Sequence, residues 1–321
     1  MARAAGVDKS TVSRVLNGSG TVAATTRERI ISVARELGYR PSAAARALRS
    51  GSSSALGVAI AGLGREAAAQ FLAGAQAEAS RESRAVLVAD LESCGLGHSP
   101  FELSVDASIG WGWLTEGQRR ALNTGPAAPL LVGECAVSQF IGSQEEQIAS
   151  MAAFRALARL GHQKVALVEE HEDLGTIREA ALRDALYESP LSMLGQTEVV
   201  RVDEATPEGA FDAVRALLTE RWTSAIAVGS PGLAPAVLEA VSESGLQVGE
   251  EVSVLLFGDS EWARAYRPQL SVVAHEVMTD GRLAAELALN PSMDLATFEV
   301  GQHWEFIPRA SFGPPRFMPG C

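Results

Sequence analysis

The 321-residue chain contains only three cysteines, Cys94, Cys135 and Cys321, and they are widely spaced. An odd number of cysteines without a C-x-x-C pair argues against a disulfide framework and against a cysteine-ligated zinc site. We therefore expect no metal and no cofactor. No apolar run reaches the roughly 18 residues needed to cross a bilayer, and no signal peptide is recognisable. These absences favour a cytoplasmic protein that does not bind membranes.

Motifs that carry common enzymatic chemistry are also missing. The chain has no G-x-S-x-G, no Walker A loop and no G-x-G-x-x-G that opens a helix after a strand. His275 and Glu276 are not followed by a second histidine at the spacing of a zinc protease. His162 follows Gly161 at a predicted helix end, where a protonated imidazole would interact favourably with the helix dipole. We expect a protein that is not an enzyme.

Charge is distributed unevenly along the chain. Residues 1–51 contain nine Lys and Arg against three acidic residues, a net charge of +6, so the remaining residues carry −18 within the total of −12. A basic segment attached to an acidic body is expected where only one end of a protein meets phosphate groups. The length suits two domains, or a small domain and a bilobed one.

The basic segment opens with the run AGVDKSTVSRVLNG, from Ala5 to Gly18. Gly6 is suited to a turn, and Asp8 is suited to the N-cap of a helix. The helix that follows carries an apolar stripe at spacings of three and four, formed by Val12, Val15 and Leu16. A short helix with Lys, Arg, Ser and Thr on one face and valines on the other fits the recognition helix of a helix-turn-helix.

Two further segments follow this helix. Residues 24–37 predict a second helix after Ala23, and its inward face is expected to contain Ile30, Ile31, Val33, Ala34 and Leu37. Residues 42–50, SAAARALRS, follow Pro41 and have high helix propensity, but they are too short to form a stable helix alone. Residues 51–54 predict a flexible linker.

In this order, the three segments resemble the DNA-binding headpiece of the LacI/GalR transcriptional regulators. The resemblance implies that Lys9, Ser10 and Arg14 reach base edges of double-stranded operator DNA. It implies that the phosphate backbone is contacted by Thr11, Ser13, Asn17 and Tyr39. It also implies that residues 42–50 form a hinge helix on DNA, in which Leu48 enters the minor groove beside Ala45.

Members of this family usually carry several residues before the position of Met1, and a valine stands at that position. We therefore expect the true start to lie upstream, with an internal Val codon read as the initiator Met. As written, the helix that braces the recognition helix would be short.

From Ala55 onward, apolar runs alternate with amphipathic segments. Strands are predicted at 55–63, 85–91, 130–134, 164–170, 197–203, 224–230 and 252–258, and helices at 71–80, 148–162, 176–188, 209–220 and 233–245. This is an α/β pattern of parallel sheets covered on both faces. Residues 91–128 and 292–304 are irregular, and we expect the first lobe to be trimmed at 91–128.

The resemblance implies a headpiece at 1–41, a hinge helix and linker at 42–54, and a bilobed periplasmic-binding-protein-like core at 55–321 that binds a small-molecule effector in the cleft between its lobes. Sugar-binding members usually have Asn-Asp, Asp-Asp and Asp-Asn pairs where this chain has Gly229-Ser230, Gly258-Asp259 and Ser143-Gln144-Glu145. Because each unpaired buried polar group costs about 1–3 kcal/mol, an ordinary neutral sugar is disfavoured. The remaining effector candidates are Phe71, Arg178, Ser230 and Asp259, and Arg178 favours an anionic or highly oxygenated ligand.

The sequence thus predicts a homodimeric transcriptional repressor whose affinity for operator DNA is changed by an effector. One alternative is a dimeric small-molecule-binding module with an impaired headpiece or without an effector. Another, a periplasmic solute-binding protein, is disfavoured because no signal peptide is recognisable.

Overall fold

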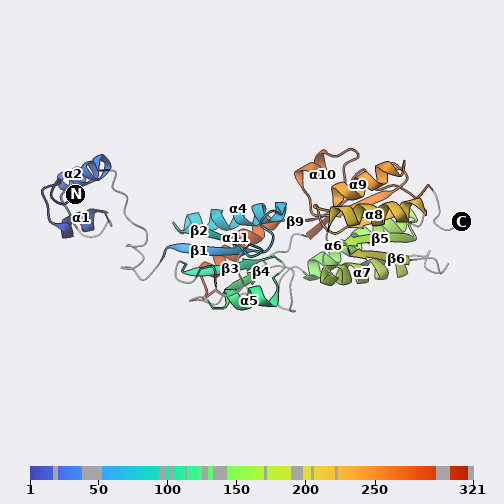
Figure 1. Ribbon diagram of the computed structural model, residues 1–321, viewed down its shortest axis with the longest axis horizontal. Coiled ribbons are helices and arrows are strands. Elements are labelled where there is room, and N and C mark those ends of the chain that lie inside the picture. The colour runs from blue at the N-terminus through green and yellow to red at the C-terminus, as the bar shows by residue number, and fades with distance from the viewer. Residues whose placement is uncertain are drawn as a thin grey trace.

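A small helical head and two α/β lobes make up the computed structural model (Figure 1). It describes residues 1–16, 21–37, 53–93, 99–101, 105–112, 114–124, 129–132, 143–169, 172–188, 198–203, 206–220, 223–293 and 304–316. The candidates Asn17, Tyr39, Ala45 and Leu48 lie outside the described residues, as does the predicted hinge helix.

The head, as described, consists of α1 (Lys9–Leu16) and α2 (Ala24–Glu36). The short bracing helix expected before α1 is wrong, because residues 2–6 form turns. Gly6 has φ +62°, as a turn before α1 requires, and Ala23 is the N-cap of α2 without a side-chain cap hydrogen bond. A small apolar cluster joins the helices through Ala5, Val12, Val15 and Ile30. The predicted inward positions of Ile31 and Leu37 are wrong, because these side chains are 37% and 57% exposed. The two helices meet over a narrower stripe than the sequence pattern indicates.

The first lobe contains a parallel sheet with strand order β2-β1-β3-β4. Its strands are β1 (Ala55–Ile60), β2 (Ala85–Asp90), β3 (Ala107–Trp111) and β4 (Leu130–Val132). One face packs against α4 (Glu66–Arg81) and α11 (Val277–Leu289), and α5 (Glu116–Leu122) contributes Leu122 to the apolar cluster on the other. The strand–helix unit that we expected to be absent at 91–128 is therefore present. Its pattern is weak because β3 has only five residues and α5 is mostly polar.

Two glycines allow α4 and α11 to pack closely. A Cβ atom on Gly74 would lie 1.9 Å from the carbonyl oxygen of Met278, and one on Gly281 would lie 2.0 Å from the carbonyl oxygen of Phe71. Because α11 follows a strand of the second lobe, this contact ties a late part of the chain to the first lobe.

The second lobe contains a sheet with strand order β10-β9-β8-β7-β5-β6, in which only β10 is antiparallel to its neighbour. Its strands are β5 (Lys164–Glu169), β6 (Glu198–Asp203), β7 (Ala225–Val228), β8 (Ser253–Phe257), β9 (Ser271–His275) and β10 (Trp304–Ile307). Its helices are α6 (Ser143–Leu160), α7 (Glu172–Tyr187), α8 (Pro207–Thr219), α9 (Ala234–Glu243) and α10 (Glu261–Ala265).

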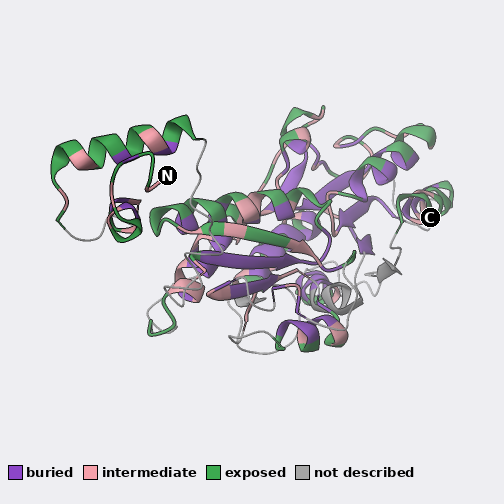
Figure 2. Ribbon diagram, turned by 60° about the vertical axis from the view of Figure 1, so that its left-hand side comes forward, coloured by how far each residue is buried: buried purple, intermediate pink, exposed green. Residues whose placement is uncertain are grey.

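Both faces of this second sheet are covered, which explains its continuous apolar runs. Within β5, Val165 and Leu167 join the cluster beneath α6 and α7, and Ala166 and Val168 join the cluster beneath α8 and α9. Figure 2 shows the central strands buried, whereas one strand of the first sheet and the outer faces of the head helices are exposed. The described elements pass between the lobes three times, from β4 to α6, from β9 to α11 and from α11 to β10. The predicted bilobed α/β architecture is confirmed.

His162, beyond the end of α6, is buried rather than a cation at a helix end. Its Nε2 lies 2.9 Å from the carbonyl oxygen of Gly313, which can only accept, so Nε2 carries the proton. The hydroxyl of Ser224 then donates to Nδ1 at 2.8 Å. Burial lowers the pKa of His162 to about 4, despite the hydrogen bond to Gly313. The predicted interaction of a protonated His162 with the helix dipole is therefore wrong, because the buried imidazole is neutral.

This burial predicts acid-sensitive stability. Between its ordinary pKa of 6.5 and the folded value of about 4, the unfolded chain binds a proton that the folded chain does not, so stability falls as the pH falls. His162 should account for a loss of about 2 kcal/mol in unfolding free energy between pH 7.5 and pH 5. Urea unfolding of the wild type and of His162→Gln at both pH values measures the difference. Equal pH dependence of the two proteins would contradict the assignment.

Candidate functional site

The outer face of α1 is the candidate nucleic-acid interface. The predicted base-contacting residues Lys9, Ser10 and Arg14 are exposed. Thr11 and Ser13 are half-buried at the edge of this face. The opposite face of α1 packs against α2, and this contact holds α1 with its polar side chains facing solvent.

The carboxyl edge of the second sheet is the candidate ligand site. The strands β5, β7 and β8 are parallel neighbours, so their carboxyl ends lie at the same edge. Glu169 ends β5, Gly229 follows β7, and Asp259 lies two residues beyond β8. Ligands of open α/β sheets bind at this kind of edge.

Arg178, on α7, is bound by groups of the chain itself. Its Nη1 donates to Glu169 Oε2 at 2.7 Å and to the carbonyl oxygen of Gly229 at 2.9 Å. Its Nη2 and Nε lie 2.8 Å and 2.9 Å from Glu146 Oε1, and its guanidinium carbon lies 3.9 Å from the ring centre of Phe257. These contacts hold together α6, α7, β5, β7 and β8.

The cluster formed by Arg178, Glu146 and Glu169 is almost completely buried. The three side chains are 3%, 7% and 1% exposed. Removing charges from water is costly unless they are paired with good geometry, and the guanidinium here meets both carboxylates at hydrogen-bond distance. A ligand oxygen could reach Arg178 only by replacing a carboxylate of the chain. This cluster is called the cleft triad below.

Gly229 is required by the position of Glu169. A Cβ atom at Gly229 would lie 2.1 Å from Glu169 Oε1, closer than any real contact. The carboxylate of Glu169 therefore occupies the space that a side chain at position 229 would need. The glycine that interrupts the expected Asn-Asp pair is thus part of the cleft triad's geometry.

Asp259 is also paired within the chain. Arg309 donates to both of its oxygens at 2.8 Å, and Arg264 donates to Oδ2 at 2.9 Å. Burial raises the pKa of Asp259, but the hydrogen bond and charge of Arg309, followed by those of Arg264, outweigh burial and hold this pKa below its ordinary value. Asp259 is therefore an ionised carboxylate with two arginine partners.

The other two effector candidates differ in their surroundings. Ser230 follows Gly229 at the same edge, and its hydroxyl accepts a hydrogen bond from the Gly232 N–H at 3.1 Å. Phe71 is fully buried in the first lobe, where its ring stacks on Trp111 with the ring centres 4.9 Å apart. The structure thus gathers Arg178 and Ser230 around Gly229 and places Phe71 in the packing of the other lobe.

Sequence reasoning missed Glu146, Glu169 and Arg309. Glu169 lies near the end of the strand predicted at 164–170, at the kind of edge where ligands bind, which was a usable signal because carboxylates are rarely buried unless they are paired. Glu146 directly follows the Ser143-Gln144-Glu145 segment that we compared with the family pattern. Nothing in the local pattern marks Arg309 as the partner of a residue 50 positions away.

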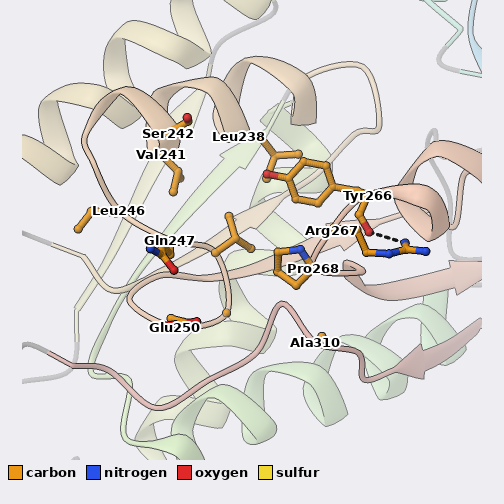
Figure 3. Close-up of a pocket in the computed structure, with 12 residues that line it drawn as sticks. Leu238, Val241, Ser242, Leu246, Gln247, Glu250, Tyr266, Arg267, Pro268 and Ala310 are labelled. Carbon is orange, nitrogen blue, oxygen red and sulfur yellow. Dashed lines mark hydrogen bonds between the residues drawn. The ribbon is translucent and has the colours of Figure 1, made fainter.

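A separate cavity of about 400 Å³ lies between the end of α9, residues 246–250 and residues 266–268 (Figure 3). Its lining includes Gln247, Tyr266 and Arg267, and the Arg267 guanidinium is bonded to three backbone carbonyls. Because residues 246–250 precede β8, this cavity lies at the opposite end of the strand from Asp259. It is not part of the carboxyl-edge site.

Two other kinds of site are not found in the described part of the chain. No group of three or more His, Cys, Asp and Glu residues there is arranged to hold a metal ion. None of the described helices is both long and apolar enough to cross a membrane.

Comparison with known families matches two parts of the chain. Residues 1–42 match the family described as bacterial regulatory proteins, lacI family. Residues 154–311 match the periplasmic binding protein-like domain. These matches cover the head and most of the second lobe.

Individual proteins are similar over nearly the whole chain. Catabolite control protein A of Priestia megaterium is 27% identical, with 89% of this chain and 90% of that protein covered. The lactose operon repressor of Escherichia coli K12 is 26% identical, with 92% and 84% covered. A crystal structure of the lac repressor dimer bound to operator and the anti-inducer ONPF superposes with a TM-score of 0.79 at 23% identity, with 97% of both chains covered.

The cleft triad predicts an unequal response to two substitutions. Arg178→Met leaves two buried carboxylates without their guanidinium and should cost about 3–5 kcal/mol of stability. Glu146→Gln keeps an acceptor oxygen and leaves the pair between Arg178 and Glu169, so it should cost at most about 1.5 kcal/mol. Urea unfolding of the full chain measures both changes. Equal losses would show that the charges do not act as a unit.

Proposed function

The chain belongs to the LacI family of bacterial regulatory proteins, and from this membership we propose that it represses transcription by binding operator DNA as a homodimer. A small-molecule effector at the carboxyl edge of the second sheet changes its affinity for DNA, which couples two sites through two states of the core. The protein acts in the cytoplasm by binding alone, without catalysis. The observation that carries this proposal is the exposed polar face of α1 on its buried support.

We assign the proposed roles to three consecutive parts of the chain. Residues 1–41 form the DNA-binding headpiece, 42–54 the hinge helix and linker, and 55–321 the core. Lys9, Ser10 and Arg14 contact base edges, where a cation on guanine is the commonest specific contact. The phosphate backbone is contacted by Thr11, Ser13, Asn17 and Tyr39, and the minor groove by Ala45 and Leu48.

An exposed edge of the first sheet supports the proposed homodimer. β2 is one of the two edge strands of the described sheet, and its Leu87 and Val88 are 38% and 47% exposed. An exposed apolar edge strand is a surface that proteins usually cover. A two-fold dimer would place two headpieces on half-sites about one helical turn apart.

We further propose that the effector presents a positive charge to the cleft triad. The cleft triad contains two buried carboxylates and one guanidinium, so a ligand that brings a positive charge beside it is favoured over one that brings a further negative charge. An anion would have to displace a carboxylate that the fold already holds beside Arg178. This proposal replaces the anionic ligand that Arg178 alone favoured in the sequence.

DNA binding should depend on α1 and on salt. Lys9→Gln and Arg14→Gln should each weaken binding to the DNA upstream of the protein's own gene by about 1–3 kcal/mol. The affinity of the wild type should fall steeply with salt concentration, because phosphate contacts release counterions. Fluorescence anisotropy at several salt concentrations measures both effects.

The matched control for these variants is Arg120→Gln, which removes the same charge from an exposed site on α5. Its affinity should equal that of the wild type. If the variants in α1 bind no worse than this control, α1 does not contact the operator.

Ligand charge should decide which small molecules stabilise the full chain. A thermal-shift panel at pH 7 should pair each amine with a neutral and an anionic analogue, as with glucosamine, glucose and glucuronate. Stabilisation is expected from the amines, because they can offset the charge of the cleft triad. Stabilisation by the neutral or anionic member alone would refute the proposed class of effector.

A further inference from the structure

Asp106 lies at the amino end of the first sheet, where residues 53–54 enter β1. Its Oδ1 accepts hydrogen bonds from the Ser53 N–H at 2.6 Å and from the Ser53 hydroxyl at 2.9 Å. Its Oδ2 accepts from the Ser54 N–H at 3.0 Å and forms an ion pair with Arg84. Two consecutive backbone amides and one hydroxyl thus converge on a single carboxylate, which is also paired with Arg84.

The backbone on either side is held as well. Ser54 has φ +52°, a left-handed conformation that a residue with a Cβ atom adopts only when its surroundings compensate. The Ala85 N–H donates to the Ser54 carbonyl oxygen at 3.0 Å, and the Asp106 N–H donates to the Ala55 carbonyl oxygen at 2.9 Å. Residues 53–55 are therefore bonded to the starts of both β2 and β3, so the flexible linker predicted at 51–54 is wrong for Ser53 and Ser54.

This anchored point is where the head is joined to the core. Residues 53–54 come directly after the stretch that connects α2 to β1 in the sequence. The amino end of β1 lies on the side of the first lobe that faces α1 and α2 (Figure 1). A carboxylate that holds residues 53–54 therefore holds the point of the core to which the head's connection is attached.

We infer that Asp106 is a positioning residue for DNA binding, which sets where each headpiece stands relative to its core and so which separation of half-sites the dimer accepts. This inference rests on the proposed function, because it requires a dimer that binds two half-sites. The Asp106 side chain is 21% exposed and that of Arg84 is 26% exposed. The cluster is therefore peripheral to the apolar core, and its loss should leave the lobe folded.

The test compares the wild type with Asp106→Ala on three DNA duplexes. These are a palindromic operator selected from random DNA and two derivatives with one central base pair inserted or removed. The wild type should bind the derivatives much more weakly than the operator. The variant should bind the operator about tenfold more weakly, since a looser attachment lowers the effective concentration of the second headpiece. It should also discriminate less among the three spacings.

Asp212→Ala is the matched control, because it removes an exposed aspartate that is paired with Arg215 on α8. It should keep the affinity and the spacing preference of the wild type. Should Asp106→Ala melt well below the wild type, Asp106→Asn takes its place, since it keeps the size of the side chain and one acceptor oxygen.

The outcomes separate the two claims. If the wild type selects and binds no operator, the proposed function fails. If the wild type binds but the Asp106 variant shows unchanged spacing discrimination, whether its overall affinity is unchanged or uniformly lower, Asp106 does not position the headpieces and the inference is overturned.

Discussion

The regulatory function depends on the separation of charge along the chain. The first 51 residues are basic and the remainder is strongly acidic, so attraction to a phosphate backbone is confined to one end of the molecule. The head that carries this charge has only a small apolar cluster around Val12, Val15 and Ile30. This small cluster holds α1 against α2, so that the polar face of α1 remains exposed to solvent. The large apolar clusters lie in the two lobes, away from the charges that meet DNA.

The acidic body has its own electrostatic centre in the cleft triad. Arg178 binds two carboxylates and a backbone carbonyl at the edge where three parallel strands end. Gly229 is a glycine because Glu169 fills the adjacent space, so a larger residue at position 229 requires a change in the side chain at position 169. The positions where the family pattern places sugar-binding side chains include Gly229, Ser230 and Gly258 in this chain, and the charged groups at the same edge are paired within the chain. The carboxyl edge of the second sheet is still the proposed ligand site, but its side chains are charged. We therefore propose a positively charged effector in place of a neutral sugar.

Local patterns predict part of this structure well. The helices α1 and α2 follow from the helical spacing of their apolar residues. Most strands of the second lobe follow from continuous apolar runs, which occur because both faces of that sheet are covered. β3 and α5 were missed because a short strand and a polar helix carry little periodic signal. The contact of α11 with α4 was missed for another reason, since it joins residues about two hundred positions apart. Such contacts arise from topology, and the sequence near each residue does not report them.

The candidate sites also differ in how far they could be predicted, because some lie on one helix and others combine distant segments. The polar face of α1 is a property of one helix, so it could be recognised from the spacing of its residues, and the family resemblance implied which of them contact DNA. The partners of Arg178 and Asp259, the neutral state of His162 and the anchor at Asp106 each depend on groups from distant segments. Ile31 and Leu37 were misplaced because the periodicity of α2 does not say how wide its contact with α1 is.

Selection of DNA by the full chain tests the central claim most directly. The protein is incubated with a random-sequence duplex pool at moderate salt, and the bound fraction is amplified and sequenced over several rounds. The account predicts enrichment of an inverted repeat whose half-sites are about one helical turn apart. The affinity for that repeat should exceed the affinity for a scrambled duplex at the same salt concentration. Failure to enrich any symmetric sequence, or equal affinity for the scrambled duplex, would contradict the conclusion that this chain is a sequence-specific regulator.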